Sequence, residues 1–156
     1  MARVAYYTDP AAPPANSIVV AVTAVVRDDT GCILMIRRTD NDLYAIPGGA
    51  QEIGETISQT VIREVKEETG ITVKVTGLIG VYSDPKHVIA FTDGEIRQEF
   101  SICFRARPTG GDLRTSTESK EVLWIDPDQL GALNIHQSIR LRIQHGLEHR
   151  TEPYYT

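Results

Sequence analysis

The sequence predicts an α/β domain in which a mixed β-sheet lies between helices. The chain has 156 residues, 41% hydrophobic and 24% charged, which is an ordinary size and composition for one globular domain. Segments rich in β-branched residues alternate with turn signals, and amphipathic helical segments occur in the middle and at the end of the chain. This order of strands, helix, strands and helix favours a sheet with helices on both faces.

The N-terminal segment 1–16 contains three prolines and little hydrophobic periodicity, so we predict an extended arm there. The domain proper is expected at 17–150, and a short tail follows at 151–156. β-branched residues dominate 17–27 and predict a buried strand. After the turn signal RDDTG, a second strand is expected at 32–38, and we predict that the two strands pair as a hairpin.

The segment 56–69 predicts the strongest helix of the chain, and a polar, glycine-rich loop at 40–55 precedes it. At the start of this helix, Thr56 and Gln59 resemble a capping box, and Gly70 is placed to end it. Apolar residues recur at four-residue steps and form one stripe, which consists of Ile57, Val61 and Val65.

The second half of the chain predicts further strands and two closing helices. An Asp-Gly pair at 93–94 indicates a hairpin turn, and a loop is expected at 109–119. The expected strands are 71–83, 87–92, 96–108 and 120–126. The expected helices are 127–133 and 136–149.

Charge and cysteine content disfavour some classes of function. The net charge of −5 and pI of about 5.3 are unsuited to a surface that coats a nucleic-acid polymer. Cys32 and Cys103 lie far apart in apolar segments, which predicts free thiols in a reducing compartment. No signal-peptide pattern is present, and the apolar run 18–26 is about half as long as a membrane span. We therefore expect a cytoplasmic protein that contacts neither membranes nor nucleic-acid polymers.

Three carboxylates crowd one face of the predicted helix, because Glu64, Glu67 and Glu68 stand at positions i, i+3 and i+4. A solvated charged face is the simpler interpretation of such a cluster. Mg²⁺, however, takes oxygen ligands from a few carboxylates together with water and substrate phosphates. The glycine-rich loop before the helix lets backbone groups approach the same place. Loop and helix together therefore predict a metal site suited to a diphosphate.

The same stretch resembles the signature of the Nudix family, Gx5Ex7REUxEExGU, in which U is an apolar residue. Every fixed position of the signature is occupied, by Gly49, Glu55, Arg63, Glu64, Val65, Glu67, Glu68, Gly70 and Ile71. The resemblance implies a Nudix α/β/α sandwich. It also implies a MutT-like pyrophosphohydrolase that uses Mg²⁺ or Mn²⁺ to cleave a nucleoside diphosphate linked to another moiety.

The resemblance also implies roles for individual residues. Glu64 and Glu68 would be the principal metal ligands, and Glu67 a further ligand or a supporting group. Glu55 would help to bind a metal or support Arg63, which would orient the glutamates by ion pairing. A loop carbonyl near Gly48 or Gly49 would complete the coordination. The expected reaction is attack of a metal-bound water on a phosphorus atom.

The base that would deprotonate this water is not evident within the motif. Some family members use a downstream glutamate from a loop that folds over the site. Glu118 and Glu121 are the candidates here, and a plain surface charge is the alternative for each.

Three residues near the end of the strand at 32–38 are candidates for substrate binding. Arg37 or Arg38 could hold a terminal phosphate, and at most one should face the site because adjacent strand residues point in opposite directions. Tyr44 could stack on a base or anchor the loop, and we favour the anchor. Other polar residues are more readily explained as structural, although they could contribute to ligand specificity or a dimer interface: Tyr82, Asp84, His87 and Arg97. His136 is expected to open the last helix.

We therefore predict metal-dependent hydrolysis of a small nucleotide or nucleoside-diphosphate derivative. The alternative is a catalytically silent Nudix domain that binds a nucleotide as a sensor. The complete set of glutamates argues against a sensor. A homodimer is suggested by the family resemblance alone.

Overall fold

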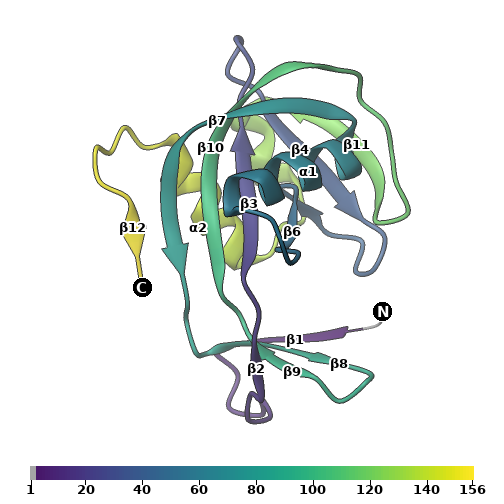
Figure 1. The fold of residues 1–156 in the computed structure, drawn as a ribbon, viewed down its shortest axis with the longest axis vertical. Helices are drawn as coiled ribbons and strands as arrows, with labels where there is room; N and C mark the ends of the chain where they lie inside the picture. Colours follow the sequence, from purple (N-terminus) through teal and green to yellow (C-terminus); the bar gives the residue numbers. More distant parts are fainter. Residues whose placement is uncertain (1–2) are drawn as a thin grey trace.

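The structure is a computed structural model that describes residues 3–156, and a five-stranded mixed sheet forms its centre (Figure 1). Strand β10 (Ser101–Gly111) pairs in parallel with β3 (Ala21–Val26) and antiparallel with β7 (Ile71–Tyr82). Two short strands form the edges, β6 (Gly48–Ala50) next to β3 and β12 (Tyr154–Tyr155) next to β7. The mixed sheet that the sequence predicts is therefore confirmed.

A second sheet contains three strands in the order β11 (Ser119–Ile125), β4 (Ile33–Arg38) and β5 (Tyr44–Ala45). Strand β4 is buried on both faces, since Met35 belongs to one hydrophobic cluster and Leu34 to the other. Alternate side chains of a strand point in opposite directions, so β4 contributes to both cores of the domain.

The predicted hairpin between 17–27 and 32–38 is wrong. Within residues 3–156, the only pairing between these segments is an isolated bridge from Arg27 to Ile33. The turn itself is present, and Asp28 holds it through hydrogen bonds that its Oδ1 accepts from the backbone N–H groups of the following residues Thr30 and Cys32. Beyond the turn the chain enters the second sheet, and β10, from much later in the sequence, takes the place beside β3.

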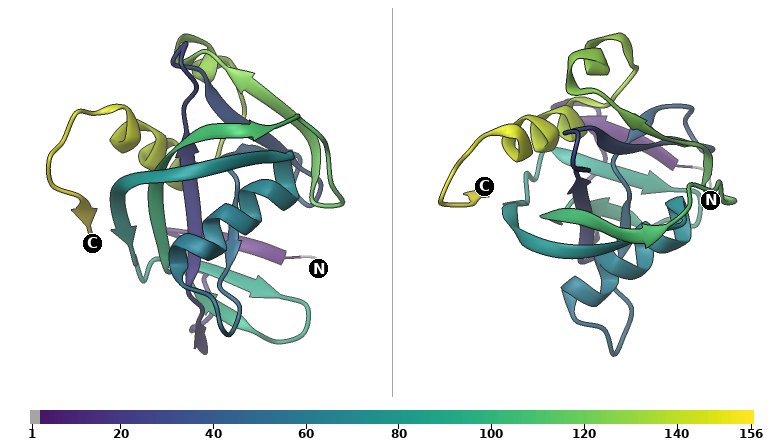
Figure 2. Two further views of the ribbon diagram at one scale, coloured as in Figure 1. Left: turned by 45° about the horizontal axis from the view of Figure 1, so that its top comes forward. Right: turned by 90° about the horizontal axis from the view of Figure 1, so that it is seen from above.

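Two helices cover opposite faces of the central sheet, as the views in Figures 1 and 2 show. Helix α1 (Ile57–Thr69) packs Val61 and Val65 into one cluster, and α2 (Gln137–Leu147) packs Ile143 into the other. A short 3₁₀ helix, η1 (Pro127–Ala132), precedes α2 where the sequence predicted a closing helix. The predicted α/β/α arrangement is confirmed. No helix within residues 3–156 is long and apolar enough to cross a membrane.

Both ends of α1 follow the sequence prediction. Thr56 and Gln59 form the capping box, in which each side chain accepts a hydrogen bond from the other residue's backbone N–H. Gly70 ends the helix with a φ of 80°, and a Cβ there would lie 2.1 Å from the carbonyl oxygen of Asp112. Only glycine fits this turn without strain.

A third, smaller sheet projects from one end of the domain (Figure 1) and has the strand order β1-β8-β9-β2. Strands β8 (His87–Phe91) and β9 (Ile96–Gln98) form the predicted Asp-Gly hairpin, and β2 is the short segment Ser17–Ile18. The predicted N-terminal arm supplies β1 (Arg3–Tyr7), which pairs antiparallel with β8. The first two residues of that arm lie outside the described residues.

Candidate active site

Two glycines of β6 place backbone directly against the catalytic candidates on α1. A Cβ on Gly49 would lie 2.4 Å from the carboxylate carbon of Glu64, and a Cβ on Gly48 would lie 2.1 Å from the carbonyl oxygen of Val22. Real Cβ atoms do not approach other atoms so closely, so a side chain at Gly49 would push the loop away from α1, and one at Gly48 would push it away from β3. The glycine-rich loop therefore lets backbone reach the glutamates, as the sequence indicates.

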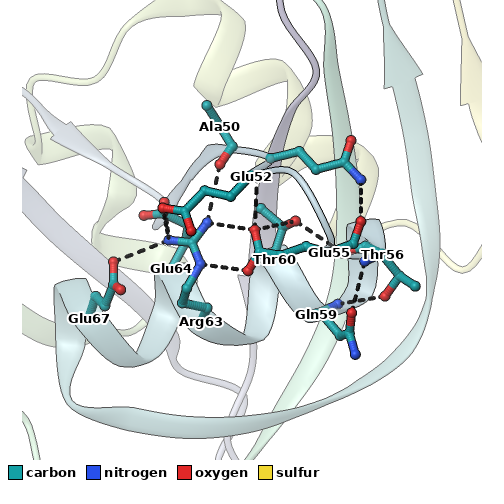
Figure 3. A network of polar contacts seen from close by, with 10 residues as sticks. Ala50, Glu52, Glu55, Thr56, Gln59, Thr60, Arg63, Glu64 and Glu67 are labelled. Atoms are coloured by element: carbon teal, nitrogen blue, oxygen red, sulfur yellow. Dashed lines mark hydrogen bonds and ion pairs between the residues drawn. The ribbon is translucent and has the colours of Figure 1, made fainter.

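Arg63 holds the acidic residues of α1 and its preceding loop together (Figure 3). Its Nε and Nη2 donate to the carboxylate of Glu55 at 2.7 and 2.9 Å. Its Nη1 donates to Glu64 at 2.8 Å and to Glu67 at 3.3 Å, and Nη2 also donates to the carbonyl of Ala50 at 3.2 Å. The guanidinium holds the pKa of Glu55 down at about 2, and the carboxylates of Glu55 and Glu64 raise the pKa of Arg63 in turn. Arg63 therefore offsets the repulsion among these carboxylates.

Glu68 is the most enclosed carboxylate of the motif, with 5% of its surface exposed. Its Oε2 accepts a hydrogen bond from the backbone N–H of Gly48 at 3.1 Å. Burial raises the pKa of Glu68 to about 8, and the nearby Glu64 and Glu118 raise it further against the opposing effect of Arg38. Burial also raises the pKa of Glu64 despite its contact with Arg63. Burial thus disfavours the charged form of both carboxylates.

The donor set at this place fits a hard divalent cation. Glu64 and Glu68 lie four residues apart on one helical face and offer carboxylate oxygens beside the backbone of Gly48 and Gly49. Within residues 3–156, no three acidic, histidine or cysteine side chains are already gathered as a metal-binding group. Glu64 is engaged by Arg63, and Glu67 stays at the exposed edge. Binding of an ion therefore requires side-chain rearrangement at the surface of α1.

A cavity of about 240 Å³ opens next to these residues and extends from α1 towards α2. We call the part of its wall formed by Gly48, Gly49, Glu68 and Glu118 the α1 end. We call the part formed by Thr23, Ser101, His136 and Arg142 the α2 end. Further polar side chains in the wall come from the small sheet and the strands next to it: Arg3, Arg38, His87, Arg97 and Glu99.

Glu118 and Glu121, the two candidates for the base, lie in different surroundings. Glu118 lines the α1 end of the cavity. The neighbouring Ser119 is buried and donates its hydroxyl to the carbonyl of Glu68 at 2.6 Å, which ties this loop to α1. Glu121 is absent from the cavity wall, and its carboxylate accepts hydrogen bonds from Arg37 at 3.0 Å and Tyr44 at 2.9 Å.

The predicted substrate-binding residues are divided in the same way. Arg38 and Tyr44 line the cavity, whereas Arg37 does not, in keeping with the alternation of side chains along β4. Arg37 instead pairs with Asp42 at 2.8 Å, and Arg38 donates two hydrogen bonds to Asp40, at 2.8 and 2.7 Å. Tyr44 lines the cavity, and its hydroxyl donates a hydrogen bond to Glu121 that anchors the loop.

Sequence reasoning missed the α2 end. His136 was expected only to open the last helix, which it does by accepting a hydrogen bond from the backbone N–H of Ser138. One signal was available for Arg142, because it stands at i+3 from Ile139 and directly before Ile143, on the apolar side of its helix. A charged residue on a buried stripe indicates a partner or a site.

The comparisons with known proteins agree with this geometry. The NUDIX domain model matches residues 18–144, which is most of the chain. The chain belongs to the Nudix family. A MutT-like protein of Streptomyces ambofaciens is 44% identical over 118 residues, covering 76% of this chain and 69% of its own length. An ADP-ribose pyrophosphatase of Methanocaldococcus jannaschii is 38% identical over 122 residues, covering 73% of this chain and 65% of its own length.

A solved structure supports the same conclusion. The MutT protein of Bacillus halodurans superposes with a TM-score of 0.67 at 28% identity, over 88% of this chain and 86% of that one. The predicted enzyme class, a Nudix pyrophosphohydrolase, is confirmed at the level of the family. The matched segment spans about two thirds of the length of the two curated relatives.

Proposed function

We propose that the protein hydrolyses the diphosphate bond of a nucleotide or nucleoside-diphosphate derivative in a reaction that requires Mg²⁺ or Mn²⁺. The observation that supports this most strongly is the position of Glu68, a buried carboxylate beside Glu64 at the wall of the cavity. Two neighbouring carboxylates with raised pKa values favour a divalent cation between them and a phosphate. The relative from M. jannaschii is an ADP-ribose pyrophosphatase, which makes ADP-ribose the first compound to test.

In this proposal Glu64 and Glu68 would hold the ion, together with a backbone carbonyl of Gly48 or Gly49. A bound divalent ion neutralises phosphate oxygens and lowers the pKa of a coordinated water. Arg63 holds Glu55 and Glu64 in place, and Glu67 at the exposed edge is a further ligand. Arg38, from the cavity wall, orients an anionic oxygen of the substrate.

Glu118 is the group that we propose as the base. Its carboxylate takes a proton from the attacking water, the new O–P bond forms, and the bridging oxygen departs with the leaving group. Glu118 lines the cavity near Glu68, whereas Glu121 is engaged by Arg37 and Tyr44 outside it. This difference favours Glu118 of the two candidates.

A substrate panel with and without Mg²⁺ tests the proposed function, with phosphate measured directly or after treatment with a phosphatase. We expect metal-dependent turnover of at least one compound. Glu68→Gln should lower kcat by roughly 10³-fold or more, as loss of a metal ligand in a hydrolase does. Glu152→Gln, at an exposed position of the tail, is the matched control and should leave the rate unchanged. Tight nucleotide binding without turnover of any compound would instead favour the sensor.

The cytoplasmic location and the homodimer remain predictions. Fractionation of cells that express the chain tests the first, and sedimentation equilibrium tests the second.

A further inference from the structure

The α2 end of the cavity contains polar groups that the proposed chemistry does not use. Its floor is the face of the central sheet that packs towards α2, where Thr23 and Ser101 stand on the neighbouring strands β3 and β10. Arg142 enters from α2, and His136 lies at the start of the same helix. Three separate parts of the chain, β3, β10 and α2, therefore converge on one place.

Three buried polar atoms have no hydrogen-bond partner anywhere among residues 3–156, and all three belong to residues of the α2 end. They are Oγ1 of Thr23, Oγ of Ser101 and Nε of Arg142. Ser101 is 1% exposed and Arg142 3% exposed. Buried polar groups in folded proteins are nearly always paired, because an unpaired group loses its hydration without compensation. Their coincidence in one cavity wall points to a ligand that supplies the missing partners.

Arg142 is the least compensated arginine of this wall. Its nearest carboxylate oxygen belongs to Glu99, 3.6 Å from Nη2, which is beyond the usual distance of a charged hydrogen bond. The ring of Tyr82 lies 5.0 Å from its Cζ and gives only a cation–π contact. By contrast, Arg97 pairs with Glu95 at 2.7 Å. A buried guanidinium with one distant counterion favours a bound anion.

The charged side chains around Arg142 also favour a bound anion. Arg3 and Arg38 share Asp40 as a counterion, at 3.3 and 2.7 Å. Burial and the nearby charge of Arg38 hold the pKa of the Arg3 guanidinium below its usual range. Arg38 and Arg97 thus have close partners in Asp40 and Glu95, whereas Glu99 is the nearby carboxylate of Arg142 and also lies near Arg3.

The histidines of the wall can donate N–H hydrogen bonds although their rings carry no positive charge. Burial lowers the pKa of His87 to about 4 and also lowers the pKa of His136, so both rings are neutral near pH 7. Nδ1 of His136 accepts the backbone N–H of Ser138, which leaves the proton of the neutral ring on Nε2. His136, Ser101 and Arg142 therefore offer N–H and O–H donors, and a ligand that accepts several hydrogen bonds at once fits them.

We propose that the α2 end binds a second anionic group of the substrate, a phosphate or carboxylate attached away from the scissile diphosphate, with Arg142 and Ser101 as its main contacts. This proposal rests on the proposed function. It narrows the substrate class to nucleoside-diphosphate derivatives that carry an additional negative charge. That charge belongs either to the moiety joined to the nucleoside diphosphate or to the nucleoside itself.

Two matched pairs of substrates test the proposal and separate these two sources. UDP-glucuronate and UDP-glucose differ by a carboxylate on the joined moiety, and NADP⁺ and NAD⁺ differ by a phosphate on the adenosine ribose. We expect a higher kcat/KM for the acidic member of at least one pair. Arg142→Met should reduce this preference about 10- to 100-fold, as loss of an ion pair does, and Ser101→Ala about 5-fold, as loss of a single hydrogen bond does.

Ser101→Ala is the decisive variant because the Ser101 hydroxyl has no partner in the protein, so its removal breaks no contact of the fold. If Arg142→Met does not fold, Ser101→Ala decides alone. Arg107→Met is the matched control. This arginine is exposed on the same strand as Ser101 and lies outside the cavity wall, so the preference should persist in that variant.

Equal kcat/KM for the two members of both pairs would overturn the proposal, as would a preference that both cavity variants retain. If the wild type hydrolyses none of the four compounds, the proposed function fails on this panel. Isothermal titration calorimetry of the binding of the four compounds then tests the subsite separately from hydrolysis. Tighter binding of an acidic member that Ser101→Ala weakens would support the subsite. Equal binding within both pairs, or none, would refute it.

Discussion

On α1, beside the α1 end of the cavity, every side-chain nitrogen of Arg63 donates to an acceptor, whereas at the α2 end Arg142 keeps an unpaired Nε. Both arginines are enclosed to a large extent and both belong to helices. Arg63 positions carboxylates, and its contacts are complete in the protein alone. Arg142 lies in a wall whose hydrogen-bond donors lack acceptors, so its remaining contacts depend on a ligand that enters the cavity. The two arginines therefore differ in their surroundings: the contacts of Arg63 are made within the protein, whereas those of Arg142 are left for a ligand to complete.

The largest effect is expected at the edge of the α1 end. Glu118→Gln removes the proposed base and should lower kcat by about 10³-fold with little change in KM, since a positioned base contributes 10²- to 10⁴-fold. Glu121→Gln is the matched control, because its carboxylate faces Arg37 and Tyr44 and should leave kcat within about 2-fold. Steady-state kinetics on the same substrate compare them. Similar rates in both variants would remove Glu118 from the mechanism.

Arg63→Lys is expected to have the next largest effect. Lysine keeps the charge, but it cannot donate to Glu55, Glu64 and the carbonyl of Ala50 in the geometry of a planar guanidinium. The glutamates then lose their fixed positions, and activity and Mg²⁺ affinity should each fall roughly 10- to 100-fold. Titration of activity with Mg²⁺ measures both quantities. A variant with the affinity and rate of the wild type would show that the α1 end does not depend on this network.

A pH effect is expected from the wall near the α2 end. Burial holds the pKa of His87 at about 4, below its usual value, so the unfolded chain binds a proton that the folded chain excludes. Stability from this group is complete above about pH 6.5 and declines as the pH falls towards 4. We expect a loss of about 2 kcal/mol in the free energy of unfolding between pH 7.5 and pH 5.

Urea unfolding at these two pH values checks the effect. His87→Gln should remove most of the difference, whereas His149→Gln, at an exposed position of the C-terminal segment, should retain it. An equally large loss in His87→Gln would mean that other groups cause the acid sensitivity.

The same contrast explains which parts of the site the sequence predicts. Apart from Glu118, the α1 end comes from one continuous stretch, in which helical spacing places Glu64 and Glu68 on one face and the capping box and Gly70 mark the helix ends. Residues of the α2 end come from separate elements. Thr23, Ser101 and Arg142 meet only because β3, β10 and α2 pack together, and no local rule indicates this.

The wrong hairpin has a related cause. Strands that follow each other closely in the sequence usually pair, and this rule predicts that the segments 17–27 and 32–38 form an antiparallel hairpin. In the fold, β10 competes for the edge of β3 and pairs with it in parallel over six residues, from Ser101 to Ala106. A partner so distant in the chain is visible only in the complete packing of the domain.

The smallest predicted effect distinguishes the two ends most directly. Thr23→Val replaces a hydroxyl that has no hydrogen-bond partner by a methyl group of nearly the same size. Without ligand, the free energy of unfolding should stay the same or rise by about 0.5–1 kcal/mol, because an unpaired buried hydroxyl is removed. Thr60→Val in helix α1 is the matched control. Its hydroxyl bonds to Glu55 and to the carbonyl of Thr56, so the same exchange there should cost about 1 kcal/mol. Urea unfolding measures both variants. If the free energy of unfolding falls equally in the two, the Thr23 hydroxyl has a hydrogen-bond partner without a ligand, and the contrast between the two ends does not extend to this position.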